Sequence, residues 1–195
     1  MRKEVSRGEK MNYWQTELIR LRGVEPEDGD TFWRWNQDSE MARNLEFVWP
    51  PVSLSQVRDW AAAESKKKMA HDSFSWVIED SEGTPVGFIH THNCHPRNGV
   101  FRYGLGVEAS QRRKGYAAAA ILLILRYYFQ ELRYQKVNVQ MHSENTSSRA
   151  LHEGLGFVRE GAVRRAIFTD GRFLDEFFYG MTVEEWQQRY GVGNG

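Results

Sequence analysis

The chain has 195 residues, of which 41% are hydrophobic and 13% aromatic, which is enough for one domain with a full core. Its 26 cationic and 26 anionic residues balance, so no bulk attraction to nucleic acid or to an anionic membrane is expected. The single cysteine, Cys94, excludes a disulfide within the chain and fits a reducing, cytoplasmic location. Residues 1–10 have no apolar run typical of a signal peptide, and the longest apolar run, 116–125, is about half a membrane span.

Sequence patterns predict strands and helices that alternate along the chain. Period-two alternation and short apolar runs predict strands over 17–22, 74–79, 86–92, 100–107, 136–142, 162–168 and 172–181. Capping boxes, acidic first turns and apolar periodicity predict helices from 26, from 53 to about 68, over 115–132, from 145 to about 155 and from 182. This order predicts an α/β (α+β) fold, with a mixed sheet of six or seven strands flanked by helices.

Residues 14–190 are expected to form one domain, because no linker, repeat or low-complexity segment interrupts them. Residues 1–13 and 191–195 are expected to be tails, the first of them flexible. Asp170-Gly171 lies between two alternating stretches, which is a typical signal of a β-hairpin.

The most informative stretch is the junction between the strand over 100–107 and the following helix. It carries Arg112-Arg113-Lys114-Gly115. A basic, glycine-containing loop directs free N–H groups to one place, and the helix dipole adds partial positive charge there. Such a junction suits a phosphate or pyrophosphate. The local pattern also fits a solvated basic turn that simply ends a strand.

A dinucleotide fingerprint is the competing interpretation. Residues 104–109 match G-x-G-x-x-A. That fingerprint requires the helix to begin among its glycines and an acid to follow about 20 residues later. Residues 112–115 separate the glycines from the helix, and the acid after the next strand, Glu144, comes too late. The dinucleotide interpretation is therefore disfavoured.

Two stretches resemble the GCN5-related N-acetyltransferase (GNAT) family. Residues 112–117 resemble its acyl-CoA pyrophosphate loop, and residues 145–157 resemble its second signature, an Asn that opens a short helix ending in Gly-Phe. Glu160-Gly161 and the hairpin at Asp170-Gly171 resemble the RimJ/RimL-like branch, which acetylates ribosomal-protein N-termini. The resemblance spans about residues 18–186. It implies a fold in which two central parallel strands splay to hold the cofactor.

The resemblance implies acetyl-CoA as co-substrate, without a metal. In family terms, Asn145 would bond the pantetheine arm and Ser148 would lie near the sulfur. His152 stands where many members carry Tyr as the general acid. These three residues share one stripe of a helix. The residues expected to contact the cofactor are Gly106, Val107, Arg112, Arg113, Lys114, Gly115, Tyr116, Ala117, Asn145 and Ser148.

The general base is not evident, although an ammonium must lose a proton before it can attack. The Glu often found in this branch would fall near Ile167, which cannot serve. His90, His92 and Glu108 are candidates by position. We expect the two histidines to line the acceptor cleft or a partly exposed strand face.

The histidines also raise a metal-site alternative. His90, His92 and Cys94 alternate, so a continuing strand would place them on one face, and His95 follows; such a set can ligate zinc. We expect no metal, because Cys94 and His95 are predicted to lie in the turn before Pro96.

Aromatic residues cluster in the first helix and the following loop: Trp33, Trp35, Phe47 and Trp49. They are expected to pack in the core or in a lid over the acceptor, where Glu40 and Glu46 could attract a cationic amine.

The sequence thus predicts an N-acetyltransferase that transfers acetyl directly to a primary amine in a ternary complex. Protein N-termini, polyamines, antibiotics and amino-acid-like amines all remain open as acceptors. The alternative is a non-catalytic CoA-binding sensor or scaffold. A homodimer is compatible with the sequence, and nucleic-acid and membrane partners are not expected.

Overall fold

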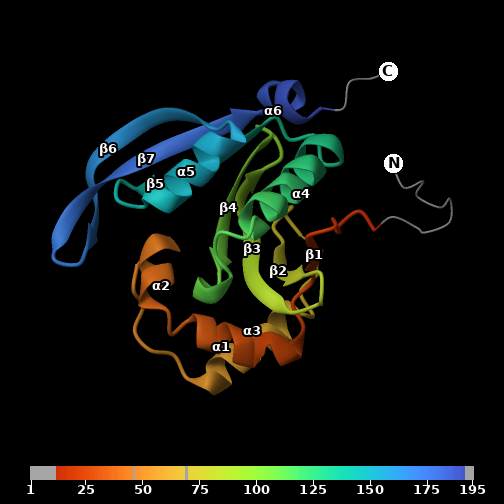
Figure 1. Cartoon of the computed structure of the whole chain (residues 1–195), viewed down its shortest axis with the longest axis vertical. Helices are drawn as coiled ribbons and strands as arrows, with labels where there is room; N and C mark the ends of the chain where they lie inside the picture. The colour runs from red at the N-terminus through yellow and green to blue at the C-terminus, as the bar shows by residue number, and fades with distance from the viewer. Residues whose placement is uncertain (1–11, 46, 69, 192–195) are drawn as a thin grey trace.

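The computed structural model describes residues 12–45, 47–68 and 70–191, and its centre is one seven-stranded sheet of order β1-β2-β3-β4-β5-β7-β6 (Figure 1). Neighbouring strands are antiparallel except β4 and β5, which are parallel. The sheet is mixed, as predicted. Its strands are β1 (Ile19–Arg22), β2 (Ser75–Asp80), β3 (Pro85–His95), β4 (Val100–Val107), β5 (Lys136–His142), β6 (Val158–Thr169) and β7 (Arg172–Thr182).

Six α-helices and two 3-10 turns accompany the strands in the described residues, and the last helix follows the last strand. They are η1 (Pro26–Asp28), α1 (Gly29–Trp35), α2 (Ser39–Leu45), α3 (Leu54–Glu64), η2 (Ala109–Gln111), α4 (Tyr116–Gln130), α5 (Thr146–Leu155) and α6 (Val183–Tyr190). The two predicted capping boxes are present: the hydroxyl of Ser53 accepts from Gln56 N, and that of Thr182 accepts from Glu185 N.

Some helix limits differ from the predicted ones. Helix α3 ends at Glu64 instead of near residue 68, because Lys67 N bonds Glu64 O in a tighter turn. Helix α4 ends at Gln130 instead of 132, just before Arg133 adopts a left-handed φ of 58°. Helix α2 was not predicted, since its seven residues bury only Met41 and show little apolar periodicity.

The two faces of the sheet carry different helices and different cores. Val77 and Phe88, opposite one another in β2 and β3, pack with α1 and α3. On the other face, the ring of Phe101 from β4 stacks on Tyr128 from α4 at 3.9 Å. Helix α5 joins that second core. Figure 1 shows α4 and α5 together, apart from the group formed by α1, α2 and α3.

The feature that positions the site is the separation of β4 from β5. In the part of the chain that the structure describes, their pairing covers three residues of each strand and stops at Arg102 and Asn138. Strand β4 stays paired to β3 as far as Val107, while β5 stays paired to β7 as far as His142. The two central strands therefore diverge, and the edge of β4 that would face β5 is left open.

The end of β3 corrects one prediction. Cys94 and His95 lie in the strand and not in the turn before Pro96, because His95 pairs with Val100 of β4. The register shifts between His92 and His95, and Asn93 takes a φ of 47° there. This bulge reverses the side of the sheet on which the following residues lie.

Most of the predicted tails, residues 1–11 and 192–195, lies outside the described residues. Tyr13, placed in the first tail by the sequence, contacts α4: the guanidinium of Arg126 lies 4.1 Å from the centre of its ring. Within the described ranges, the structure contains no helix with the length and apolar character required to cross a bilayer.

Candidate active site

The junction before α4 has a backbone suited to an anion. Gly115, at the N-cap, has a φ of 88°, a left-handed conformation that disfavours residues with a Cβ. The next residues, from Tyr116 on, form the first turn of α4, whose N–H groups have no partners within the helix. Together with the helix dipole, these donors can bind a pyrophosphate.

The side chain of Arg112 does not point freely toward such an anion. Its guanidinium donates to Asp38 Oδ2 at 2.9 Å, to Glu40 Oε1 at 3.2 Å and to the carbonyl of Val107 at 3.2 Å. Two carboxylates therefore balance its charge. Arg112 was expected to contact the cofactor; its guanidinium links the loop to the start of α2.

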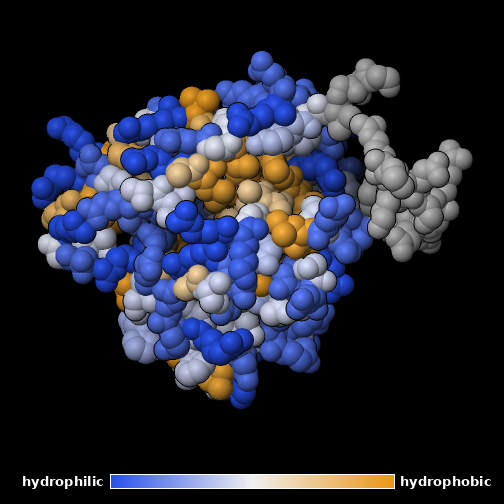
Figure 2. Space-filling view, in the orientation of Figure 1, coloured by the Kyte–Doolittle hydropathy of each residue, from blue (hydrophilic) through white to orange (hydrophobic). Residues whose placement is uncertain are grey.

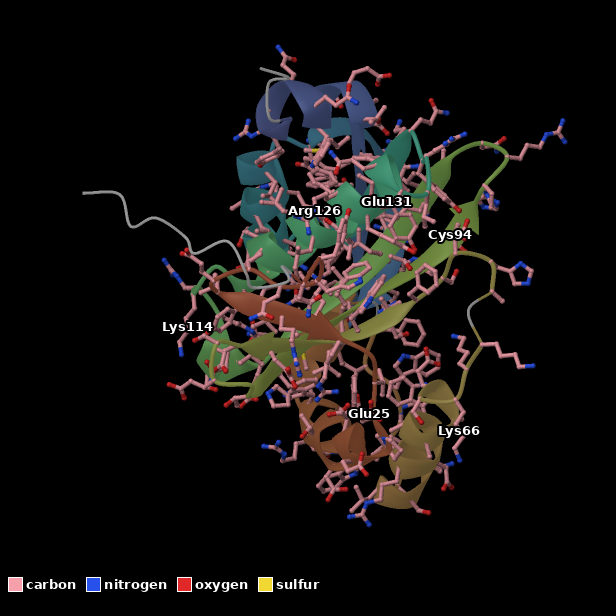
Figure 3. The ribbon with its side chains drawn as sticks, turned by 90° about the vertical axis from the view of Figure 1, so that its right-hand side faces the viewer. Glu25, Lys66, Cys94, Lys114, Arg126 and Glu131 are labelled. Atoms are coloured by element: carbon pink, nitrogen blue, oxygen red, sulfur yellow. The ribbon has the colours of Figure 1, made fainter. Side chains whose placement is uncertain are left out.

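The other two cations of the loop remain at the surface. Arg113 is exposed, and Lys114 donates to Gln111 Oε1 at 2.7 Å. Figure 3 shows Lys114 at the end of the sheet opposite Cys94. Steering of an anion would come from these two side chains.

The open edge of β4 leads from this loop into the molecule. Gly106 has no side chain on the face covered by α2, where a Cβ would lie 2.9 Å from the sulfur of Met41. The carbonyl of Val107 is already bonded to Arg112. Figure 2 shows hydrophobic surface exposed between α4 and α5, beside the place where β4 and β5 separate. An extended, partly apolar chain such as pantetheine fits this position.

Asn145 and Ser148 begin α5 as predicted. The side-chain oxygen of Asn145 accepts from Ser148 N at 3.0 Å, and its amide nitrogen donates to Asn44 O at 3.2 Å. Asn145 therefore caps α5 and ties it to the end of α2.

His152 is enclosed and bonded at both ring nitrogens. Nδ1 lies 2.7 Å from the carbonyl oxygen of Ser148, and Nε2 lies 2.8 Å from the hydroxyl of Tyr103. A carbonyl can only accept, so Nδ1 carries the proton and Nε2 accepts from Tyr103. The hydroxyl of Ser148 also lies 3.2 Å from Nδ1, as expected for one helix stripe.

Burial keeps both members of this pair neutral. It lowers the pKa of His152 to about 4, although the bond to Ser148 opposes that shift. It raises the pKa of Tyr103 well above its usual value. In this arrangement His152 has no free N–H that could donate to a departing thiolate. The hydroxyl group next to its ring is that of Tyr103. Sequence reasoning missed Tyr103, because nothing in the sequence pairs it with a residue 49 positions away.

Of the three base candidates, two lie on the opposite face of the sheet. The rings of His90 and His92 are 5.4 Å apart, and His90 lies directly over Gly104, where a Cβ would be 2.4 Å from its Cε1. Burial and then the neighbouring His92 lower the pKa of His90 to about 4. Glu108 is engaged elsewhere: Trp35 Nε1 donates to it at 3.1 Å.

Two further groups near the diverging strands were not predicted. Glu176 of β7 lies opposite His142 of β5 in the register. Burial raises the pKa of Glu176 and lowers that of His142. His142 Nε2 lies 3.1 Å from Asn44 Oδ1, so α2 contacts β5 here. The alternating pattern of residues 172–181 indicated a strand and did not single out its carboxylate.

The structure separates Cys94 from the two histidines of the zinc alternative. The bulge at Asn93 places Cys94 on the α4 face, with its sulfur 3.9 Å from the hydroxyl of Tyr128. His90 and His92 lie on the other face. Across the described residues, no group of three or more His, Cys, Asp or Glu side chains is placed to hold a metal ion.

The aromatic residues near the first helix divide into two sets. Trp35 is buried and stacks with Phe88, and Trp33 packs against the same cluster. Phe47 and Trp49 contact one another at 4.1 Å and are exposed. Glu40 is paired with Arg112. Glu46 lies outside the described residues.

Comparison with known proteins shows which family the chain belongs to. Residues 19–158 match the model of the acetyltransferase (GNAT) domain. The chain belongs to the GNAT family. It is 39% identical over 181 residues to the SPbeta prophage-derived N-acetyltransferase YokL of Bacillus subtilis (strain 168), covering 93% of this chain and 99% of YokL. It is 25% identical over 173 residues to YdaF of the same organism, named as a candidate ribosomal N-acetyltransferase, covering 88% of this chain and 94% of YdaF.

The structure of the GNAT chain also resembles solved members of the family. Spermidine N-acetyltransferase from Vibrio cholerae, in complex with CoA and spermine, superposes with a TM-score of 0.76. The two chains are 19% identical, over 88% of this chain and 99% of the other, so this likeness concerns the fold. The family match and the named relatives together identify the protein as an acetyl-CoA-dependent N-acetyltransferase.

Proposed function

We propose that this enzyme transfers acetyl directly from acetyl-CoA to a primary amine, on a small molecule or a protein N-terminus, in a ternary complex. The observation that carries the proposal is the open edge of β4, which has the Gly115 loop and α5 on one side of the sheet and His90 on the other. Two substrates can therefore approach one strand from opposite faces, and no covalent enzyme intermediate is required.

On the first face, backbone groups from Gly115 to Ala117 hold the pyrophosphate, with Arg113 and Lys114 attracting it. The β4 backbone before Val107 bonds the pantetheine. One of its N–H groups polarises the thioester carbonyl, where negative charge develops as the amine attacks. Acetyl-CoA supplies the acetyl group.

The departing sulfur is stabilised on the same face. The amine forms a C–N bond, the C–S bond breaks, and the proton lost by the amine ends on the thiolate or in solvent. We assign the hydrogen bond to the thiolate to the hydroxyl of Tyr103, whose single proton turns from His152 Nε2 to the sulfur as the C–S bond breaks; Ser148 is the second hydroxyl available. His152 is then a positioning residue, in line with its bonds at both nitrogens.

On the second face, His90 is the group that meets the amine. With a pKa of about 4 it is neutral and binds protons weakly, so it accepts a hydrogen bond from an amine that has already lost its extra proton. Glu176, with its raised pKa, is the carboxylate in this region best suited to take a proton. His92 and Glu108 are the weaker alternatives, Glu108 because Trp35 already bonds it.

Initial-rate kinetics of CoA release with a panel of amines tests the proposal. Direct transfer in a ternary complex gives intersecting double-reciprocal lines when acetyl-CoA and amine are varied, whereas a covalent acetyl-enzyme gives parallel lines. Acetyl-CoA binding without release of CoA on addition of any amine would instead support the non-catalytic sensor or scaffold.

A further inference from the structure

A pocket of about 540 Å3 lies between α1, α3 and strands β2 and β3, and His90 is part of its lining. This volume is within the range typical of small-molecule sites. The pocket leads to β4, because the ring of His90 lies over Gly104 of that strand. A molecule in the pocket can therefore present one end to the strand on which acetyl transfer is proposed.

Aromatic rings line the way from the surface to His90. Trp60, 43% exposed, meets Phe32 edge to face at 4.8 Å. Phe32 lies 5.7 Å from Phe88, and Phe88 is nearly parallel to His90 at 6.3 Å. Rings in contact with one another in this way offer a continuous aromatic wall, against which a flat or branched apolar group can pack.

The charges in the pocket are few and already balanced. Glu64 is the sole carboxylate among the described residues of its lining, and it is paired with Lys67 at 3.2 Å. His90 is neutral. A polyamine carries several cations that require several carboxylates, and a free amino acid carries a carboxylate that requires an unpaired cation. Neither pattern of charge is matched by these side chains.

We propose that this pocket selects as acceptor a primary monoamine joined by a short linker to an aromatic or branched apolar group. The apolar group lies among Phe32, Trp60 and Phe88, and the amine reaches His90 at β4. This inference rests on the proposed acetyl transfer and names its substrate class. Tryptamine is a suitable probe, with spermidine and a short peptide as competing acceptors.

The test compares wild type, Trp60→Ala and Trp60→Phe, with Trp49→Ala as a matched control. Trp49 is 63% exposed and contacts Phe47 outside the pocket lining. We expect kcat/KM for tryptamine to exceed that for spermidine and the peptide at least tenfold. Trp60→Ala should raise KM for tryptamine about tenfold with little change in kcat or in KM for acetyl-CoA. Trp60→Phe should restore most of the affinity, and Trp49→Ala should behave as wild type.

Calorimetric binding of tryptamine to the protein saturated with CoA separates this inference from the proposed function. Equal or better use of spermidine or the peptide, or no effect of Trp60→Ala, would overturn the inference while acetyl transfer stood. If no amine were acetylated but tryptamine bound and Trp60→Ala weakened it, the apolar pocket would be supported and the proposed acetyl transfer overturned.

Discussion

In the function that we propose, the two faces of the sheet recognise their ligands by different means. On the face of α4 and α5, the binding groups are mainly backbone N–H groups in one contiguous loop, and the polar side chains are bonded to one another, as in Tyr103 and His152. On the face of α1 to α3, aromatic side chains from three separate segments surround a pocket with few free charges. Binding of a cofactor that all members of the family use can thus depend on one short motif. Recognition of the acceptor would instead depend on side chains from separate segments, which can vary independently.

The largest effect is expected from Gly115→Val, which tests the backbone-based face. A β-branched residue disfavours the φ of 88° and would hold side-chain atoms close to the bound phosphates. We expect CoA affinity to fall at least about 100-fold in calorimetry. Gly83→Val is the control, since Gly83 has a φ of 81° in a turn with open space around it. If the Gly115→Val protein folds and binds CoA with unchanged affinity, the loop at Gly115 does not bind the pyrophosphate.

Tyr103→Phe tests the bonded pair on the same face. It removes the hydroxyl that we assign to the thiolate and leaves His152 Nε2 without its partner. We expect kcat to fall roughly 10- to 100-fold with little change in CoA affinity. Tyr134→Phe is the matched control, because it removes a buried hydroxyl that bonds Asp72. Wild-type kcat in Tyr103→Phe would shift the role to Ser148 or solvent.

The histidines on both faces predict a loss of stability in acid. His90 and His152 have pKa values of about 4 in the folded protein, against about 6.5 when unfolded. The unfolded chain binds more protons between these values, so stability is full above pH 6.5 and falls as the pH drops toward 4. For each histidine, the free energy of unfolding should fall by about 1 to 2 kcal/mol between pH 7 and pH 5. Urea titrations at both pH values should show a smaller loss in His152→Phe and in His90→Gln than in wild type; equal losses would contradict the burial argument.

The smallest effect is expected for the ion pair between Arg112 and Asp38, which links the loop before α4 to α2. Arg112 joins the cofactor loop to Asp38, which also caps α2 by accepting from Met41 N at 2.9 Å. Both side chains are partly exposed, so a double-mutant cycle with Arg112→Gln and Asp38→Asn should give a coupling of only about 0.5 kcal/mol. KM for acetyl-CoA should rise a few-fold. The exposed pair Arg58 and Asp30 is the control, and the absence of coupling at Arg112 would show that α2 and the loop act independently.

Local patterns predicted most of the elements because the energies that form them are local. The strands over 100–107 and 136–142 have the predicted limits, since both alternate and end at turn residues. The capping boxes at Ser53 and Thr182 form within four residues of sequence. The bulge at Asn93 was missed, because it arises from pairing with β4 and not from the residues themselves. Helix α2 was missed for a related reason: contacts with β4, β5 and Arg112 hold it.

The sequence by itself determined the family, the strand–loop–helix junction at Gly115 and the cap at Asn145, because each depends on a few neighbouring residues in a fixed local conformation. Only the tertiary structure decided what these residues contact. It paired Tyr103 with His152, turned Arg112 toward two acids, placed Cys94 away from the histidines and gathered Phe32, Trp60 and His90 around one pocket. Such contacts depend on sheet register and helix packing between distant segments, and residue spacing along the chain does not encode them directly.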